Sequence, residues 1–212
     1  MHFNTNNKVI LVGYSSHALV VAEAMMLSGY RIIGYLDKER SITNLLKLEY
    51  LGFDHDEAVL KKIKGDKVFI AIGDNQTRES ISTFMEINGF DFSLAIHPDA
   101  NVSKYATIGK GTLVARGANI NPFAAIGKGV IINTGAIIEH ECLIDDFANI
   151  SPGAVLAGKV KVGKGSFIGA NAIVKQGVEI GKNVIVGAGA VILKEVPDNL
   201  IMVGNPAKRM IK

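Results

Sequence analysis

The sequence has few of the residues that cross-link small proteins or anchor them in membranes. It contains no tryptophan, five prolines and one cysteine, Cys142, in 212 residues. A single cysteine excludes an intramolecular disulfide. No apolar run approaches the length of a membrane span, and the first eight residues have no signal-peptide pattern. We therefore expect a cytoplasmic protein that does not insert into a membrane.

The charge is equally modest, with 23 basic and 20 acidic residues and a formal net charge of +3. The lysines are dispersed, and no basic run is interleaved with aromatic residues, so nucleic acid is not an expected partner. Hydrophobic residues make up 48% of the chain. This is sufficient for two modest domains, each with its own core.

The C-terminal half has an uninterrupted six-residue repeat. Sixteen aliphatic residues occupy every sixth position: Val102, Ile108, Val114, Ile120, Ile126, Ile132, Ile138, Ile144, Ile150, Leu156, Val162, Ile168, Val174, Ile180, Val186 and Ile192. A strand and a turn every six residues is the period of a hexapeptide β-helix, in which units bury their apolar positions by stacking. Three units make one coil, so residues 18 apart lie above one another. The repeat predicts about five coils of a triangular prism over residues 101–196.

The turns of this repeat also follow a rule. Three residues after the aliphatic position, where the backbone commonly needs a positive φ, Gly or Asn stands in ten of the sixteen units. Four of the six exceptions are 18 apart, so they share one edge of the prism: Tyr105, Phe123, Glu141 and Lys159. We expect irregular turns along this edge, and a departure of this kind is a place to look for function.

The same edge carries the catalytic candidate. His140 is the only histidine in residues 101–196, and it stands beside Glu141. A neutral imidazole suits a general base near pH 7, and an adjacent carboxylate orients it; the alternative is an ordinary exposed turn histidine. One imidazole is too few for a three-histidine zinc site, so we expect no metal. Cys142 falls on an inward position, which favours packing over a nucleophilic role.

The N-terminal part has a different pattern. Aliphatic strands are predicted at residues 8–12, 30–37 and 67–72, with helices at 18–28 and up to Ile87, and a polar passage without elements between residues 38 and 66. This alternation indicates a small parallel α/β unit. Pro98 ends it, so we place one domain at residues 1–98 and the other at 99–212.

The strands of this unit end at polar residues. Ser15, Ser16, His17, Asp37 and Gly73 follow the predicted strands, where parallel sheets bind ligands. Helix N-terminal N–H groups suit a phosphate, and a carboxylate suits a ribose or base. A dinucleotide site is the rival, but the turn after the first strand lacks the second and third glycines of its fingerprint. Helix capping by the serines and a solvated Asp37 are the simpler alternatives. Together these residues favour a small nucleotide ligand.

Several motifs in this order resemble a known family. They are Gly13-Tyr-Ser-Ser-His17, Tyr35-Leu-Asp37, Ala71-Ile-Gly-Asp-Asn75, Ile138-Ile-Glu-His-Glu-Cys142, the hexapeptide array, and Gly204-Asn-Pro-Ala-Lys208. The chain resembles the sialic-acid O-acetyltransferase-like branch of left-handed β-helix acyltransferases. Its most similar members acetylate the 4-amino group of UDP-4-amino-4,6-dideoxy sugars in bacillosamine synthesis. The resemblance implies a Rossmann-like domain followed by a left-handed parallel β-helix, an α/β plus β fold.

It also implies a homotrimer that uses acetyl-CoA and a nucleotide sugar, in bacterial glycan biosynthesis. His140 would be the general base and Glu141 its companion in a direct transfer, with a backbone N–H stabilising the oxyanion. By position, the sugar nucleotide would be contacted by Ser15, Ser16, His17, Asp37, Lys38 and Gly73, and the coenzyme by Asn149, Ala170 and Ala188. Asn149 replaces a histidine of the family and cannot share in base catalysis.

Other acceptors and another class of function fit the same sequence. The first alternative is O-acetylation of a sialic-acid-like sugar or N-acetylation of a GDP-linked amino sugar. The second is a non-catalytic trimeric scaffold that binds a nucleotide sugar. A scaffold has no use for an imidazole and a carboxylate on one aberrant edge, so His140 and Glu141 favour an enzyme.

Overall fold

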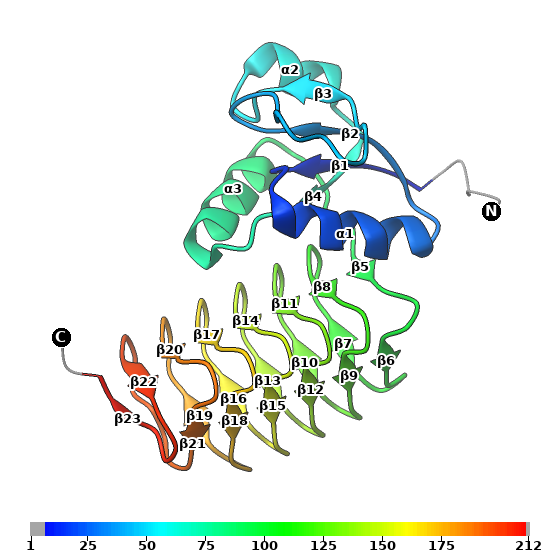
Figure 1. Cartoon of the computed structure of the whole chain (residues 1–212). Helices are drawn as coiled ribbons and strands as arrows, with labels where there is room; N and C mark the ends of the chain where they lie inside the picture. The colour runs from blue at the N-terminus through cyan, green and yellow to red at the C-terminus, as the bar shows by residue number, and fades with distance from the viewer. Residues whose placement is uncertain (1–6, 211–212) are drawn as a thin grey trace. The chain divides into compact units, whose positions relative to one another are not determined.

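A computed structural model of the chain describes residues 7–210. It divides into two compact units, one ending at Pro98 and the other beginning at Asp99. Figure 1 shows the first as a sheet with helices and the second as a stack of short strands.

The N-terminal unit contains a four-stranded parallel sheet in the order β3-β2-β1-β4. Its elements are β1 (Lys8–Val12), α1 (Ser16–Leu27), β2 (Arg31–Leu36), β3 (Tyr50–Gly52), α2 (Glu57–Lys62), β4 (Lys67–Ile70), α3 (Asn75–Ile87) and β5 (Ala95–Ile96). The inner strand β1 and the edge strand β4 are buried at every residue but the first, as their continuous aliphatic sequences predict. The carboxyl ends of these strands lead into α1 and α3.

The passage between β2 and β4 was predicted without elements, which is wrong. It contains β3, which pairs with β2, and the short helix α2. Asp56 is the N-cap of α2, and its carboxylate accepts a hydrogen bond from Ala58 N at 2.8 Å. Gly34 lets the passage approach β2, because a Cβ there would lie 2.7 Å from Glu49 O. These elements are too short and too polar for a periodic sequence pattern.

The C-terminal unit is a parallel β-helix with three sheets, each named here by its first strand. The β6 face has β6 (Asn101–Val102), β9 (Asn119–Ile120), β12 (Ile137–Ile138), β15 (Val155–Leu156), β18 (Ile173–Val174) and β21 (Val191–Ile192). The β7 face has β7 (Thr107–Ile108), β10 (Ala125–Ile126), β13 (Leu143–Ile144), β16 (Lys161–Val162) and β19 (Glu179–Ile180). The β8 face has β8 (Leu113–Val114), β11 (Ile131–Ile132), β14 (Asn149–Ile150), β17 (Phe167–Ile168), β20 (Ile185–Val186), β22 (Ile201–Val203) and β23 (Lys208–Arg209).

The 18-residue register predicted from the repeat is present among the strands from β6 to β21, whereas β22 pairs with β20 at a spacing of 16 residues and β23 is antiparallel to β22. Ile126, for example, is paired with Ile108 on one side and Ile144 on the other. The repeated aliphatic residues from Val114 to Ile192 are buried, whereas Val102 and Ile108 of the first coil are only half-buried. An end coil has another coil on one side only, so its apolar positions are less completely covered.

The prediction of irregular turns along one edge is wrong for three of its four residues. Phe123, Glu141 and Lys159 have φ values of 63°, 60° and 62°, within the range of the regular Gly and Asn turns, whereas Tyr105 in the first coil does not have a positive φ. At those three positions the turn shape is kept, and only the residue type departs. A non-glycine residue in this conformation costs about 1–2 kcal/mol, so the exceptions are strained rather than reshaped.

The close spacing of the coils generates a prediction about two glycines. A Cβ at Gly163 would lie 2.6 Å from the backbone carbon of Gly181, although its backbone is not in the left-handed region. Gly135 has a φ of 65° but nothing within 4 Å of a Cβ. We expect Gly163→Ala to lower the free energy of unfolding by about 3 kcal/mol, because backbone must move, and Gly135→Ala by about 1 kcal/mol from strain alone. Urea titrations of both variants measure the difference, and equal losses would contradict it.

Candidate active site

The turn between β12 and β13 presents His140 and Glu141 together. His140 Nδ1 lies 3.1 Å from Glu141 Oε2, and the two side chains are 47% and 50% exposed. When the carboxylate is ionised, Nδ1–H donates to it, and the lone pair of Nε2 is left to accept a proton. The sequence predicts this pairing for a general base and its orienting carboxylate.

This turn is held by the coils on both sides. Glu141 N donates to Pro122 O of the preceding coil at 3.1 Å, and Lys159 N of the next coil donates to His140 O at 2.9 Å. Lys159 Nζ also lies 3.7 Å from the Glu141 carboxylate. An ion pair this exposed contributes little to stability. It places a positive charge beside the carboxylate that His140 contacts.

Gly158 is a residue of this site that the sequence prediction missed. A Cβ there would lie 2.6 Å from both Nε2 and Cε1 of His140, so the ring rests directly against the backbone of the next coil. The sequence carried a signal for Gly158. In this turn the left-handed position is occupied by Lys159 rather than by glycine, and the glycine stands one residue earlier.

Cys142 has the packing role expected for it. Its side chain is fully buried, and Sγ donates to Ala157 O at 3.2 Å. Burial is the main reason why the pKa of the thiol is raised to about 11. The protonated thiol is a poor nucleophile at neutral pH, so it forms no nucleophile–base pair with His140.

The three residues expected to contact the coenzyme lie elsewhere on the prism. Asn149 is on the β8 face and 6% exposed, with its amide oxygen 3.5 Å from Ser151 Oγ. Ala170 and Ala188 occupy one edge between the β8 and β6 faces, and Gly189 N donates to Ala170 O at 2.8 Å. His140 is on the edge between the β6 and β7 faces. One chain therefore does not bring these groups together with His140.

In the N-terminal unit, the predicted residues gather at the carboxyl ends of β1, β2 and β4. Ser15 is the N-cap of α1 but makes no side-chain capping bond, and Ser15 and Ser16 are exposed. Asp37 binds the neighbouring loops, accepting from Tyr14 N at 2.8 Å and Lys38 N at 2.7 Å. Capping therefore does not account for the Ser15 hydroxyl, whereas the Asp37 carboxylate already has a structural role.

His17 lies against Gly73, where a Cβ would be 3.8 Å from the imidazole Cγ. Its Nε2 is buried and has no hydrogen-bond partner among the described residues. Burial, followed by the nearby Arg78 guanidinium, lowers the pKa of His17 from 6.5 to about 4. The side chain is consequently a neutral imidazole at pH 7.

Arg78 was not predicted as part of this region. Its side chain is 1% exposed, and the guanidinium donates to Gly73 O at 2.9 Å, Ile72 O at 3.1 Å and Asn75 Oδ1 at 2.8 Å. Burial lowers its pKa to about 10, so it stays charged at pH 7. These hydrogen bonds hold the loop between β4 and α3 in place. Only its position one turn into α3, four residues after Asp74, hinted at this role.

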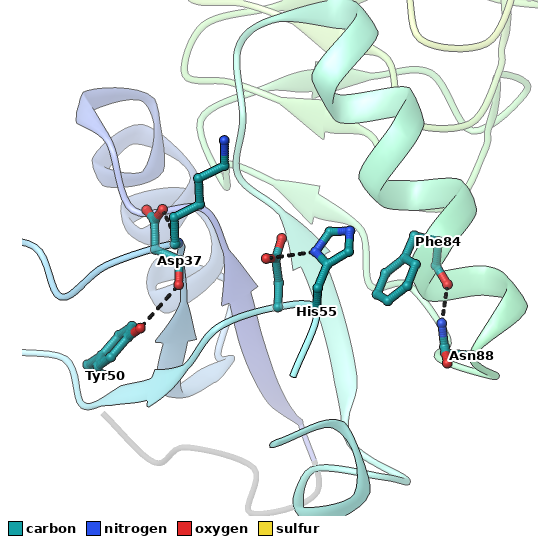
Figure 2. Close-up of polar contacts among 7 residues, drawn as sticks. Asp37, Tyr50, His55, Phe84 and Asn88 are labelled. Atoms are coloured by element: carbon teal, nitrogen blue, oxygen red, sulfur yellow. Dashed lines mark hydrogen bonds and ion pairs between the residues drawn. The ribbon is translucent and has the colours of Figure 1, made fainter. Parts of the chain in front are cut away.

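A second missed feature is a pocket of about 620 Å³ beside Lys38. The His55 ring stacks on Phe84 at 4.1 Å between centroids, and its Nδ1 lies 3.0 Å from Asp54 Oδ1. Figure 2 shows His55 between this carboxylate and Phe84, with Tyr50 bonded to the carbonyl of Asp37 nearby. Phe53, Gln76, Thr77, Ser80 and Ile81 complete the lining. The pocket combines stacking surface with polar groups at the ligand-binding edge of the sheet.

Among residues 7–210, no helix is both long and apolar enough to cross a bilayer. No cluster of three or more His, Cys, Asp and Glu side chains in that range has the arrangement of a metal site.

Two family models match the chain. The PglD N-terminal domain matches residues 8–84, and the hexapeptide repeat of succinyl-transferase matches residues 159–194. The UDP-N-acetylbacillosamine N-acetyltransferase of Bacillus subtilis (strain 168) is 37% identical over 108 residues. That alignment spans about half of this chain and half of the curated relative.

Solved structures match over almost the full length. The acetyltransferase domain of PglB from Neisseria gonorrhoeae FA1090 in complex with acetyl coenzyme A is 35% identical, with 97% of this chain and 100% of that chain covered and a TM-score of 0.90. PerB from Caulobacter crescentus in complex with CoA and GDP-perosamine is 35% identical, with 98% and 99% covered and a TM-score of 0.90.

These matches confirm the expected fold class and the resemblance on which it was partly based. A small Rossmann-like parallel α/β domain precedes a left-handed parallel β-helix, in the same order as in both structures. The chain belongs to the hexapeptide-repeat sugar N-acetyltransferases that begin with a PglD N-terminal domain.

Proposed function

We propose that this chain transfers the acetyl group of acetyl-CoA to the 4-amino group of a nucleotide-linked 4-amino-4,6-dideoxy sugar, with UDP as the preferred nucleotide. The observation that carries the proposal is the 3.1 Å contact between His140 Nδ1 and Glu141 Oε2, in a chain of this family. The Bacillus subtilis relative is named for a UDP-linked sugar, which supports UDP.

The reaction proceeds in one transfer. The acceptor amine attacks the thioester carbonyl carbon while Nε2 of His140 takes its proton, and Glu141 stabilises the imidazolium that forms. A backbone N–H of a β-helix turn donates to the developing oxyanion. The carbon–sulfur bond then breaks, and the thiolate of CoA receives the proton from the imidazolium. Asn149 acts at most as a hydrogen-bond donor to the thioester, because an amide cannot serve as a base.

The nucleotide sugar binds at the carboxyl edge of the N-terminal sheet. The backbone N–H groups at the start of α1, near Ser15 and Ser16, attract a diphosphate. His17 beside Gly73 offers an unpartnered neutral nitrogen that can donate to an oxygen. The pocket beside Lys38 supplies the aromatic side chains of Phe53 and His55 as apolar surface for the nucleotide.

Catalysis requires a homotrimer. Ala170 and Ala188 lie on a different edge from His140, so coenzyme held by one copy would reach the His140 edge of its neighbour. Two faces of the prism present apolar side chains, with Ile173 on the β6 face and Phe167 and Ile185 on the β8 face 37–46% exposed. The β7 face is more polar, because its one side chain of this kind, Leu143, stands beside the Lys161–Glu179 ion pair. Two apolar faces per copy fit a closed ring in which each subunit contacts two others.

A GDP-linked amino sugar is the second candidate acceptor. PerB was solved with GDP-perosamine and CoA, and its identity to this chain equals that of the PglB domain. The two candidates share the chemistry at His140 and differ in the nucleotide that the N-terminal unit binds.

Replacement of the base tests the mechanism. We expect His140→Ala to lower the rate of free-thiol release from acetyl-CoA by about 10²–10⁴-fold, the usual contribution of a general base. Lys194→Ala is the matched control, because Lys194 occupies the same turn position three coils further along, is exposed, and should retain full activity. Normal turnover by the His140 variant would exclude this residue as the base.

The nucleotide is tested with matched UDP- and GDP-linked 4-amino-4,6-dideoxy sugars. We expect the UDP-linked acceptors to give the higher kcat/KM, measured by thiol release and by mass spectrometry of the acetylated sugar. A preference for GDP would establish the second candidate. If neither series gives thiol release although the acetyl-CoA is intact, the proposed substrate class is refuted.

The pKa of His17 generates a separate prediction. Because the folded-state pKa of about 4 lies below the ordinary 6.5, the unfolded chain binds a proton at His17 before the folded chain does. The contribution of His17 to the free energy of unfolding is then fully present above pH 6.5 and is lost as the pH falls toward 4. We expect the His17 imidazole resonances to titrate near pH 4 in NMR spectra, and His17→Gln to flatten the pH dependence of stability in this window. A midpoint near 6.5 would contradict this assignment.

A further inference from the structure

We propose that His55 selects the base of the nucleotide, by accepting a hydrogen bond from a ring N–H of the base through its Nε2 atom. The inference rests on the proposed nucleotide-sugar substrate and names the residue that reads its base. Uracil and guanine carry a ring N–H on the Watson–Crick edge, whereas cytosine and adenine carry a bare ring nitrogen there. His55 therefore favours the first two bases, whichever of them the acceptor contains.

Asp54 determines which nitrogen of His55 carries the proton. His55 Nδ1 lies 3.0 Å from Asp54 Oδ1, and the two side chains are 44% and 7% exposed. An ionised carboxylate can only accept a hydrogen bond, so the proton of a neutral imidazole is held at Nδ1. Nε2 is left with a lone pair and has no partner among the described residues. It is available as an acceptor for a ligand.

Aromatic neighbours fix the plane of the imidazole. The ring stacks on Phe84 with centroids 4.1 Å apart at 15°, and on Phe53 with centroids 5.2 Å apart at 25°. Phe84 in turn packs against the core of the N-terminal unit. Figure 2 shows the His55 ring between Phe84 and the carboxylate that it contacts. The lone pair of Nε2 thus has a fixed direction, and a preorganised acceptor distinguishes ligands without an entropy cost of ordering.

The pocket that His55 lines has the groups that a base requires. Its volume is about 620 Å³, which lies within the usual range for small-molecule sites. Phe53 and Ile81 provide apolar surface, and Gln76 and Ser80 provide an amide and a hydroxyl group. A planar base needs apolar contact on its faces and hydrogen-bonding groups at its edge. The pocket offers both.

The pocket also adjoins the place proposed for the diphosphate. Asp37 Oδ2 accepts from Tyr14 N at 2.8 Å, in the turn that leads into α1. Asp37 Oδ1 accepts from Lys38 N at 2.7 Å, and Lys38 lines the pocket. A nucleotide presents its diphosphate, ribose and base in this order. With the diphosphate at the start of α1 and the ribose at Asp37, the base enters the pocket that contains His55.

Two matched pairs of nucleotides measure the selection, UDP against CDP and GDP against ADP. We expect the nucleotide with a ring N–H to bind about tenfold more tightly than its partner, because one hydrogen bond replaces two opposed lone pairs. Calorimetric titration of the full chain at about pH 8, where histidine is usually neutral, gives the four affinities. Since uracil and guanine share the ring N–H, the result does not depend on which of them the natural acceptor carries.

Two variants assign the selection to His55. His55→Phe keeps a ring beside Phe84 but has no lone pair, so it should lower the affinity for UDP about tenfold and leave that for CDP unchanged. Asp54→Asn frees the tautomer, because an amide can accept from Nδ1 or donate to it, and the preference for UDP should fall. Glu57→Gln is the matched control. It removes an exposed carboxylate from the first turn of α2 and should alter neither affinity.

Equal binding of UDP and CDP by the unmodified chain would overturn the inference, as would the absence of binding by all four nucleotides. An undiminished preference in a folded His55→Phe variant would overturn it too. If that variant does not fold, Asp54→Asn decides, and an unchanged preference there has the same meaning. Failure of the proposed acetyl transfer would appear separately, as absence of thiol release by a chain that still distinguishes UDP from CDP.

Discussion

The hydrogen-bond ladder between successive coils is the constraint on which the β-helix and its candidate site depend. Each two-residue strand pairs with strands 18 residues away, as Leu143 does with Ala125 and Lys161. No single strand is long enough to be stable by itself, so each unit is held only by its neighbours. This stacking sets the position of every turn along the prism.

The turn that carries the proposed site is held in the same way. His140 and Glu141 are bonded through their backbones to Lys159 on one side and Pro122 on the other. The proposed catalytic pair is therefore fixed by main-chain bonds, and its side chains need only one further contact each to be oriented. The left-handed turn position also allows a residue other than glycine at the cost of strain. The chain accepts that strain along this edge, where Phe123, Glu141 and Lys159 project.

The N-terminal unit positions polar groups by a different device. Its parallel strands end in loops that are tied from within, by the Asp37 carboxylate on one side and the buried Arg78 guanidinium on the other. Arg78 also helps to keep His17 neutral. The loops that would meet a nucleotide are thus ordered by charges that need not contact it, while the Ser15 hydroxyl and His17 Nε2 keep hydrogen-bonding capacity.

The six-residue period was enough to predict the β-helix, its 18-residue register and the inward position of Cys142, because these follow from which side chains must avoid water. It also brought His140 and Glu141 to notice by their place in the column. The period could not reveal that the turns at Phe123 and Glu141 stay regular, since a backbone conformation is imposed by the coils above and below. The same limit applies to Gly158 beneath the imidazole, Arg78 beneath its loop and His55 against Phe84. Each depends on contacts between segments brought together only by folding, whereas a periodic pattern records only whether a position is buried.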